Sequence, residues 1–306
     1  MFFRTYHDQQ GGSIPTADPA TVSDFRLDNY AVTVGRFRRF VAATIAGLPP
    51  PAARAGIHTH LNGGMGLENS ANPGTFEAGW DPAWTIPTTA TDWGAELTSQ
   101  CDSTGQYPTW TATSGANENR PINCVNWYEA YAFCIWDGGF LPSATETEYA
   151  AAGGTSQRKY PWGTTDPGGL TSIGSTIDPS QAIRYAIFGD DSGNCFYPTG
   201  TTAPCTGSAN IAPVGTATLG VGRWGQFDLA GNVGAWSLDW DHFPLANPCV
   251  NCANLTMPTV GAAARTGEDG YYAGPPSWLH PRVGGGGGFP SQHNSGAGGV
   301  RCARTP

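Results

Sequence analysis

Residues 121–154 read PINCVNWYEAYAFCIWDGGFLPSATETEYAAAGG, and this stretch carries the clearest local structure signals in the chain. Asn126, followed three residues later by Glu129, has the spacing of a helix capping box, and apolar residues recur behind it at helical intervals. Ser143 and Glu146 repeat the same spacing. A pair of glycines, which favour the end of a helix, follows each segment. The stretch therefore predicts two short helices in the middle of the chain.

A strand and a further helix are predicted nearer the start of the chain. Residues 25–32 alternate apolar and polar side chains, as a half-buried strand does. Thr33 then has the character of an N-cap. The helix behind it would place Phe37, Phe40 and Val41 on one face.

Most of the remaining chain is predicted to be loop. Residues 46–120 form a turn-rich excursion, and we expect four tryptophans to pin it to the body of the protein: Trp80, Trp84, Trp93 and Trp110. Glycine, proline, serine and threonine dominate residues 160–222, which are also predicted to be loop. Residues 226–240 are predicted to be a turn flanked by strand-like pieces. No internal repeat or linker is visible, so residues 1–306 are predicted to be a single domain.

The composition fits an irregular, loop-rich globule. Charged residues are 13% of the chain, about half of the usual share of roughly 25%. Low charge argues against disorder, and 11 tryptophans, 11 tyrosines and 13 phenylalanines supply large apolar faces for a core. The composition predicts a small sheet and a few helices under long loops, which is an α+β protein.

Charge and the length of apolar runs count against nucleic-acid binding and against a membrane span. A net charge of −9 counts against nucleic acid, because phosphate contacts need clustered lysine and arginine. Arg36, Arg38 and Arg39 form the only basic cluster, and an exposed helix face explains it better than a binding patch does. No stretch reaches the roughly 18 apolar residues of a membrane span.

Eight cysteines, an even number, predict disulfides and a secreted or cell-surface protein. No signal peptide is visible before the domain, so we expect the sequence to be a mature or trimmed form. Cys249 and Cys252 form one C-x-x-C pair, within a segment that reads as a turn. A structural disulfide is favoured there over redox chemistry, and no second pair or histidine pair supports zinc.

The six histidines show no metal-ligand spacing. His58 and His60 are two residues apart on a loop, and the other four are scattered along the chain. A chance arrangement of surface histidines is therefore favoured over a metal site.

Seven segments, in order, resemble the family of formylglycine-generating enzymes and their sulfatase-modifying-factor relatives. They run from about residue 25 to residue 304: YAVTVGRF at 30–37, PINCVNWYEA at 121–130, WDGGFLP at 136–142, EYAAAGG at 148–154, YPWG at 160–163, DLAGNV at 228–233 and RCA at 301–303. The resemblance implies a fold related to C-type lectins, with a small twisted antiparallel sheet, two or three short helices and long loops. It also implies a disulfide between Cys134 and Cys302. Sequence proximity then favours Cys101–Cys124, Cys195–Cys205 and Cys249–Cys252.

One departure from the family concerns copper. The family binds copper through two cysteines between an Arg-Gly-Gly-Ser motif and the final Arg-Cys. Here Arg282-Val283 leads into five glycines, and the only later cysteine is Cys302. The interval from Val283 to Cys302 is also shorter than the corresponding interval in the family. Copper is not expected, because no thiolate pair is available to hold this soft metal. No Glu-x-x-His or three-histidine set replaces the cysteines, which disfavours the iron-dependent relatives.

A second departure concerns calcium. The resemblance implies a calcium ion near the segment 231–236, where Ala235 replaces the acidic ligand of the family. The side chain of Asn232 and the carbonyl of Val233 remain as oxygen ligands, with water or Asp239 to complete the shell. Alternatively, Asn232 satisfies only the backbone of a turn. We expect any bound metal to be calcium.

These departures favour a non-catalytic extracellular module that binds a protein or a glycan at the cell surface, or that self-assembles. Its predicted contact surface lies near the C-terminus, with the aromatic and polar residues Tyr271, Tyr272, Trp278, Phe289, His293 and Asn294. The alternative for the aromatic residues is a role as core anchors. Two other functions stay open: a metal-dependent oxidoreductase with an unrecognised site, and a ligand-binding protein diversified at its C-terminus. Whether the chain is an enzyme is left open, with a pseudoenzyme favoured.

Overall fold

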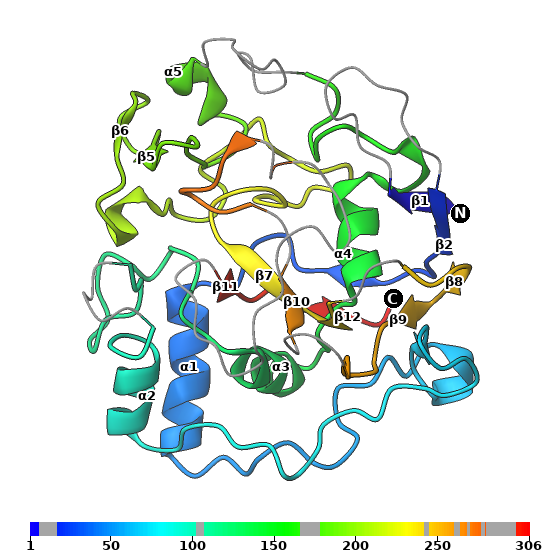
Figure 1. The fold of residues 1–306 in the computed structure, drawn as a ribbon. Coiled ribbons are helices and arrows are strands. Elements are labelled where there is room, and N and C mark those ends of the chain that lie inside the picture. Colours follow the sequence, from blue (N-terminus) through cyan, green and yellow to red (C-terminus); the bar gives the residue numbers. More distant parts are fainter. Residues whose placement is uncertain are drawn as a thin grey trace.

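The structure is a computed structural model. It describes residues 1–5, 17–101, 107–165, 178–241, 245–259, 264–267, 270–276, 279 and 298–306. It has the mixed helix and strand character expected of an α+β protein, with small sheets and long loops (Figure 1).

The three helices predicted from capping signals are present. Helix α1 spans Val34–Ile45 and begins at Thr33, whose side-chain oxygen accepts a hydrogen bond from the Arg36 amide. Helices α3, Trp127–Trp136, and α4, Ala144–Ala151, both begin with complete capping boxes. Local hydrogen bonding at the first turn is thus sufficient to locate all three helix starts.

Two further helices were not predicted. Helix α2, Ala90–Glu96, lies inside the excursion and is capped by Thr89, and α5, Pro179–Ala182, is a single turn. Among the described residues there are also three short 3-10 turns: η1 at Asn62–Gly64, η2 at Gly154–Ser156 and η3 at Ser208–Asn210.

Strand β7, Gly234–Trp240, is the longest strand among the described residues and lies near the centre of the fold (Figure 1). It pairs antiparallel with β10, Arg265–Gly267, and parallel with β11, Gly298–Gly299. This three-stranded sheet is therefore mixed, whereas an antiparallel sheet was expected.

The other strands are short and tie distant segments together. Strand β3, Arg26–Leu27, pairs with β12, Ala303–Arg304, near the C-terminus. In the described part of the chain, the remaining pairs are β1 (Phe2–Thr5) with β2 (Ala17–Thr21), β2 with β8 (Cys249–Val250), β4 (Glu68–Asn69) with β9 (Cys252–Ala253), and β5 (Asn194–Cys195) with β6 (Ala203–Pro204).

The strand predicted at residues 25–32 is mostly irregular, and only β3 pairs as a ladder. The reason is a change of partner along the segment. The Asp28 amide donates to the Cys302 carbonyl, the Asn29 carbonyl accepts from Phe227, and the Val32 amide donates to Val300. The alternating pattern correctly indicated a half-buried segment, but not one continuous ladder.

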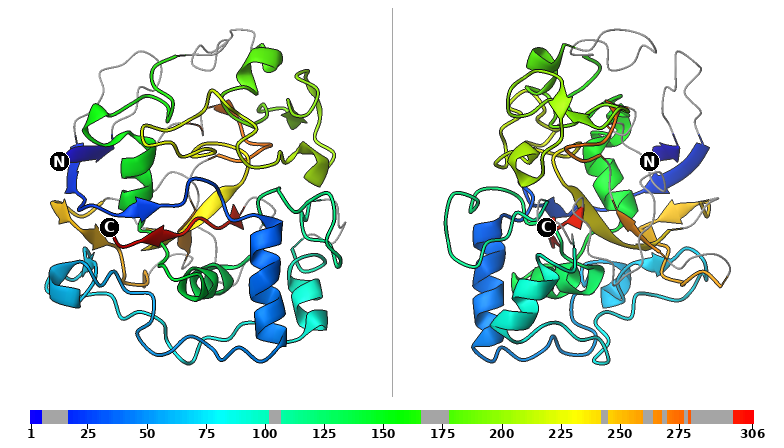
Figure 2. Two further views of the ribbon diagram at one scale, coloured as in Figure 1. Left: turned by 180° about the vertical axis from the view of Figure 1, so that it is seen from behind. Right: turned by 60° about the vertical axis from the view of Figure 1, so that its left-hand side comes forward.

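The largest core cluster joins α1 and α3 to β7 and to the last residues of the chain. The tryptophans of the excursion pack into it, as predicted: Trp80 and Trp93 are 1% exposed and Trp110 is 9% exposed. Trp84 is partly buried, with its ring edge-on to Trp127, 5.3 Å between centroids. Figure 2 shows α1, α2 and α3 on one side of β7, with α4 on the other.

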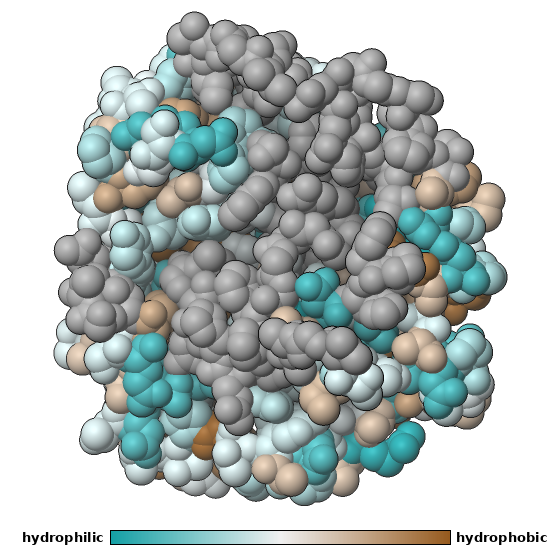
Figure 3. Space-filling model, viewed as in Figure 1, coloured by the Kyte–Doolittle hydropathy of each residue, from teal (hydrophilic) through white to brown (hydrophobic). Residues whose placement is uncertain are grey.

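No helix in the described part of the chain is both long and apolar enough to cross a membrane. On the face drawn in Figure 3, hydrophobic residues of the described surface form small separate spots among polar ones.

Candidate functional site

All eight cysteines lie within the described residues, and all are in disulfides. The bonds join Cys101 to Cys124, Cys134 to Cys302, Cys195 to Cys205 and Cys249 to Cys252. The pairing implied by the family resemblance and the three pairings favoured by proximity are therefore present. Cys134 and Cys302 are fully buried, in the core between α3 and the last strand.

The pairing of the cysteines determines whether this chain can hold copper through thiolate ligands. A cysteine binds a soft metal as the thiolate, and a disulfide sulfur is not a thiolate. Cys302 is the only cysteine after Cys252, and its sulfur is bonded to that of Cys134. The cysteines present do not fit a copper site of the family type. Residues 282–288, where the sequence departs from the Arg-Gly-Gly-Ser motif of the family, lie outside the described residues.

Asn232 holds the backbone of a neighbouring loop. Its Oδ1 accepts from the Ala212 amide at 3.0 Å, and its Nδ2 donates to the Ala212 carbonyl at 3.2 Å. The side chain is buried, and its φ of 63° lies in the left-handed region, where asparagine is favoured over most residues. This geometry favours the interpretation of Asn232 as a turn residue.

Asp239 lies at the far end of β7 from Asn232. Its Oδ2 accepts from the Ala144 amide and its Oδ1 from the Asn254 amide, each at 2.8 Å. Extended backbone rises about 3.3 Å per residue, so the structure does not bring Asp239 to Asn232 and Val233. Asp239 instead ties the start of α4 to β7. No cluster of three or more acidic, histidine or cysteine side chains that could hold a metal ion occurs in the described ranges. Calcium at Asn232 and Val233 stays a prediction.

Replacing Asn232 with glycine is expected to destabilise the protein whether or not a chelator is present. Glycine keeps the positive φ without strain, so the change removes only the amide and its two bonds to Ala212. Leaving these buried backbone groups without partners costs about 2–4 kcal/mol of unfolding free energy. Urea denaturation with and without EGTA measures this loss. A loss that disappears in EGTA, with calcium found in the wild-type protein, would instead assign Asn232 to a calcium site.

Of the predicted contact surface, the structure describes only Tyr271 and Tyr272. Tyr272 is 3% exposed and packs among Ile187, Cys195 and Val233, so it is a core anchor. Tyr271 is half-buried, edge-on to Tyr272 with 5.6 Å between ring centroids. Burial raises the pKa of Tyr271, and nearby Tyr107 raises it further. The other four residues of that surface, Trp278, Phe289, His293 and Asn294, lie outside the described residues.

His58 was expected to be a surface histidine, but it is fully buried between two glutamates. Its Nδ1 lies 2.9 Å from Glu77 Oε2, and its Nε2 lies 3.1 Å from Glu146 Oε2. Burial alone would lower the pKa of His58, but the charges of Glu146 and Glu77 outweigh it and raise this pKa to about 10. An imidazolium therefore bridges the excursion to α4 at neutral pH.

His60 has a different protonation state. Burial, and then the positive charge of His58, lower the pKa of His60. Its ring stacks on Phe140 at 5.7 Å between centroids and lies 6.1 Å from the ring of His58. The two histidines thus form one charged bridge and one neutral ring, which is packing chemistry rather than a set of metal ligands.

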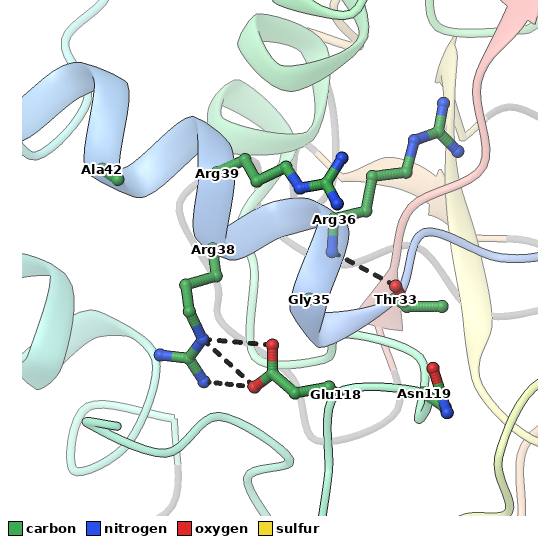
Figure 4. Close-up of a pocket in the computed structure, with 8 residues that line it drawn as sticks. All are labelled: Thr33, Gly35, Arg36, Arg38, Arg39, Ala42, Glu118 and Asn119. Carbon is green, nitrogen blue, oxygen red and sulfur yellow. Dashed lines mark hydrogen bonds and ion pairs between the residues drawn. The ribbon is translucent and has the colours of Figure 1, made fainter. Parts of the chain in front are cut away.

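Two of the three arginines at the start of α1 are held by acidic partners. Arg36 pairs with Asp28 and Asp137, and Arg304 pairs with the same two carboxylates, which closes a four-membered ring of ion pairs. Arg38 binds Glu118 at 2.7 Å, and its guanidinium lies over the ring of Trp110. Figure 4 shows the Arg38–Glu118 pair on one side of a groove beside α1.

Comparison with known proteins finds a family match along almost the whole chain. A family model described as a sulfatase-modifying factor enzyme 1-like domain matches residues 3–306. The chain is 29% identical over 251 residues to a formylglycine-generating enzyme of Thermomonospora curvata, covering 76% of this chain and 68% of the relative.

Two further similarities were found. An inactive C-alpha-formylglycine-generating enzyme 2 of Bos taurus is 30% identical over 117 residues, which is 38% of this chain and 32% of the relative. Among solved structures, PvdO from Pseudomonas aeruginosa aligns with a TM-score of 0.49 and 16% identity, covering 100% of this chain and 91% of that one. The chain spans only part of the length of the curated relatives.

Proposed function

The chain belongs to the sulfatase-modifying factor enzyme 1-like family, and from this premise we propose that it is a non-catalytic, extracellular binding or assembly module. The observation that carries the proposal is the pairing of all eight cysteines in disulfides. Oxidation of a cysteine peptide on a copper–thiolate centre needs a free thiolate, and this chain holds none.

Two further observations support the proposal. The family includes relatives named as inactive, such as the Bos taurus protein, so loss of activity on this scaffold has a precedent. Four disulfides are typical of proteins from oxidising compartments, which agrees with a secreted or surface location. The partner proposed is a protein or glycan at the cell surface, or a further copy of the chain.

We expect no conversion of a sulfatase-type cysteine peptide to formylglycine, even with copper and oxygen supplied. The test is peptide turnover followed by mass spectrometry, with the Thermomonospora curvata enzyme as positive control. Alkylation without reductant should modify no cysteine, whereas alkylation after reduction and unfolding should modify eight.

Aldehyde product above a heat-killed blank would contradict the proposal. The competing function, a metal-dependent oxidoreductase, has its own readout. Stoichiometric copper or iron in the purified protein would favour it over a binding module.

A further inference from the structure

The groove beside α1 has a volume of about 650 Å³. It is lined by Thr33, Gly35, Arg36, Arg38, Arg39, Ala42, Glu118 and Asn119 (Figure 4). This volume is within the usual range for small-molecule sites, roughly 300–1,000 Å³. Three arginines line this one groove, although the chain as a whole has a net charge of −9.

The three arginines are not equivalent. Arg36 and Arg38 are neutralised by their carboxylate partners, which also fix the directions of the two guanidinium groups. Arg39 is exposed, and within the described part of the chain its guanidinium makes no hydrogen bond or ion pair. The groove therefore offers one uncommitted positive charge, with a planar fork of donors suited to a carboxylate.

Neutral polar side chains of the groove offer a ligand hydrogen bonds in addition to the charge of Arg39. Asn119 is exposed, and within the described ranges only its backbone carbonyl accepts a hydrogen bond, from the Val214 amide. The Thr33 oxygen already accepts from the Arg36 amide, so its hydroxyl hydrogen remains available for donation. An amide and a hydroxyl that line the same groove as a guanidinium suit a ligand that is rich in hydroxyl groups.

Glu118 sets the kind of ligand that the groove accepts. Its oxygens bind Arg38, yet a carboxylate has about four acceptor positions, so it can still accept from ligand hydroxyls. The Arg38–Glu118 pair carries no net charge, so the groove has no further positive charge for a ligand with anionic groups along its whole length. A ligand with one carboxylate for Arg39 and hydroxyls for Glu118 satisfies both conditions.

We propose that this groove binds a sugar that carries a carboxylate, that is, a uronic acid. The inference rests on the proposed binding role and names a ligand class for it. The carboxylate pairs with Arg39, and ring hydroxyls donate to Glu118 and accept from Asn119 and Thr33.

The experiment titrates three small probes by calorimetry or NMR: glucuronate, glucose and N-acetylaspartate. Glucuronate should bind more tightly than glucose, which lacks the carboxylate, and more tightly than N-acetylaspartate, which lacks the sugar ring. Arg39→Gln should weaken glucuronate binding about tenfold, as expected for loss of a charge-assisted hydrogen bond. It should leave glucose binding unchanged.

Two further variants test the site itself. Arg184→Gln removes one positive charge from a different exposed arginine, which follows helix α5, and should not change glucuronate binding. Ala42→Trp fills the groove from an exposed helix position without changing charge, and should abolish binding. The melting temperature of each variant shows whether it is folded.

The proposal is overturned if the wild-type protein does not bind glucuronate. It is also overturned if Arg39→Gln and Arg184→Gln weaken glucuronate binding equally. Tighter binding of N-acetylaspartate than of glucuronate would assign the groove to an acidic peptide instead. None of these outcomes bears on peptide turnover, so failure here is distinguishable from failure of the proposed function.

Discussion

Replacing His58 with alanine is expected to lower the free energy of unfolding by about 3–5 kcal/mol, the usual cost of removing one partner from a buried ion pair. The change leaves Glu77 and Glu146 buried without the cation that both of them contact. Native domains are typically stable by only about 5–15 kcal/mol, so the loss is a large fraction of the total. Denaturant unfolding measures it.

His60→Ala is the matched control, because it removes a neighbouring ring that is already neutral. Its cost should be smaller, since no buried carboxylate loses a partner. Equal losses for the two variants would show that ring packing, and not charge, explains the contribution of His58.

The same bridge predicts a pH dependence. The pKa of His58 is raised from 6.5 to about 10 in the folded protein, so its contribution is fully present below pH 6.5 and is lost as the pH rises through 10. The stability difference between wild type and a folded His58→Gln variant should therefore shrink over this window. Titrating groups that do not interact with His58 cancel in the difference, whereas Glu146 and His60 do not, because the charge of His58 lowers the pKa of both. A difference that stays constant from pH 6 to pH 10 would contradict the bridge.

The second large effect is loss of the disulfide between Cys134 and Cys302. These residues are 168 positions apart, and closing so long a loop restricts the unfolded chain by about 5 kcal/mol in the chain-entropy treatment. Replacing both cysteines with alanine should remove most of that stability. The measurement is the free energy of unfolding under non-reducing conditions.

The disulfide between Cys249 and Cys252 is the matched control. It closes a loop with a sequence separation of only 3, for which the same treatment gives about 2 kcal/mol. Replacing this pair with alanine should therefore be clearly less destabilising. If the two double variants are equally unstable, loop entropy is not what these disulfides contribute.

Local signals in the sequence predicted the local structure well. The capping residues Asn126 and Ser143 and the N-cap Thr33 act within their own first turn, so their spacing alone locates three helices. The tryptophans of the excursion were also predictable, since large aromatic side chains need burial.

Apart from Cys134–Cys302, which the family resemblance implied, side-chain partners distant in sequence were not predictable. His58 meets Glu77 and Glu146 across 19 and 88 residues, and no spacing rule covers such separations. Arg36 was correctly placed on a helix, but its ring with Asp28, Asp137 and Arg304 depends on how that helix packs. The capping role of Glu146 was visible in the sequence, whereas its role as a counter-ion for His58 arises only from the fold.

The Cys134–Cys302 bond also determines how the protein responds to a protease. It makes residues 134–302 a covalently closed ring, from which only the segments before Cys134 and after Cys302 extend. A single cut inside this ring opens it without releasing a fragment, because both halves stay attached through the bond. In an environment with proteases, the chain can thus be nicked in the loops between residues 134 and 302 and still remain one molecule until the disulfide is reduced.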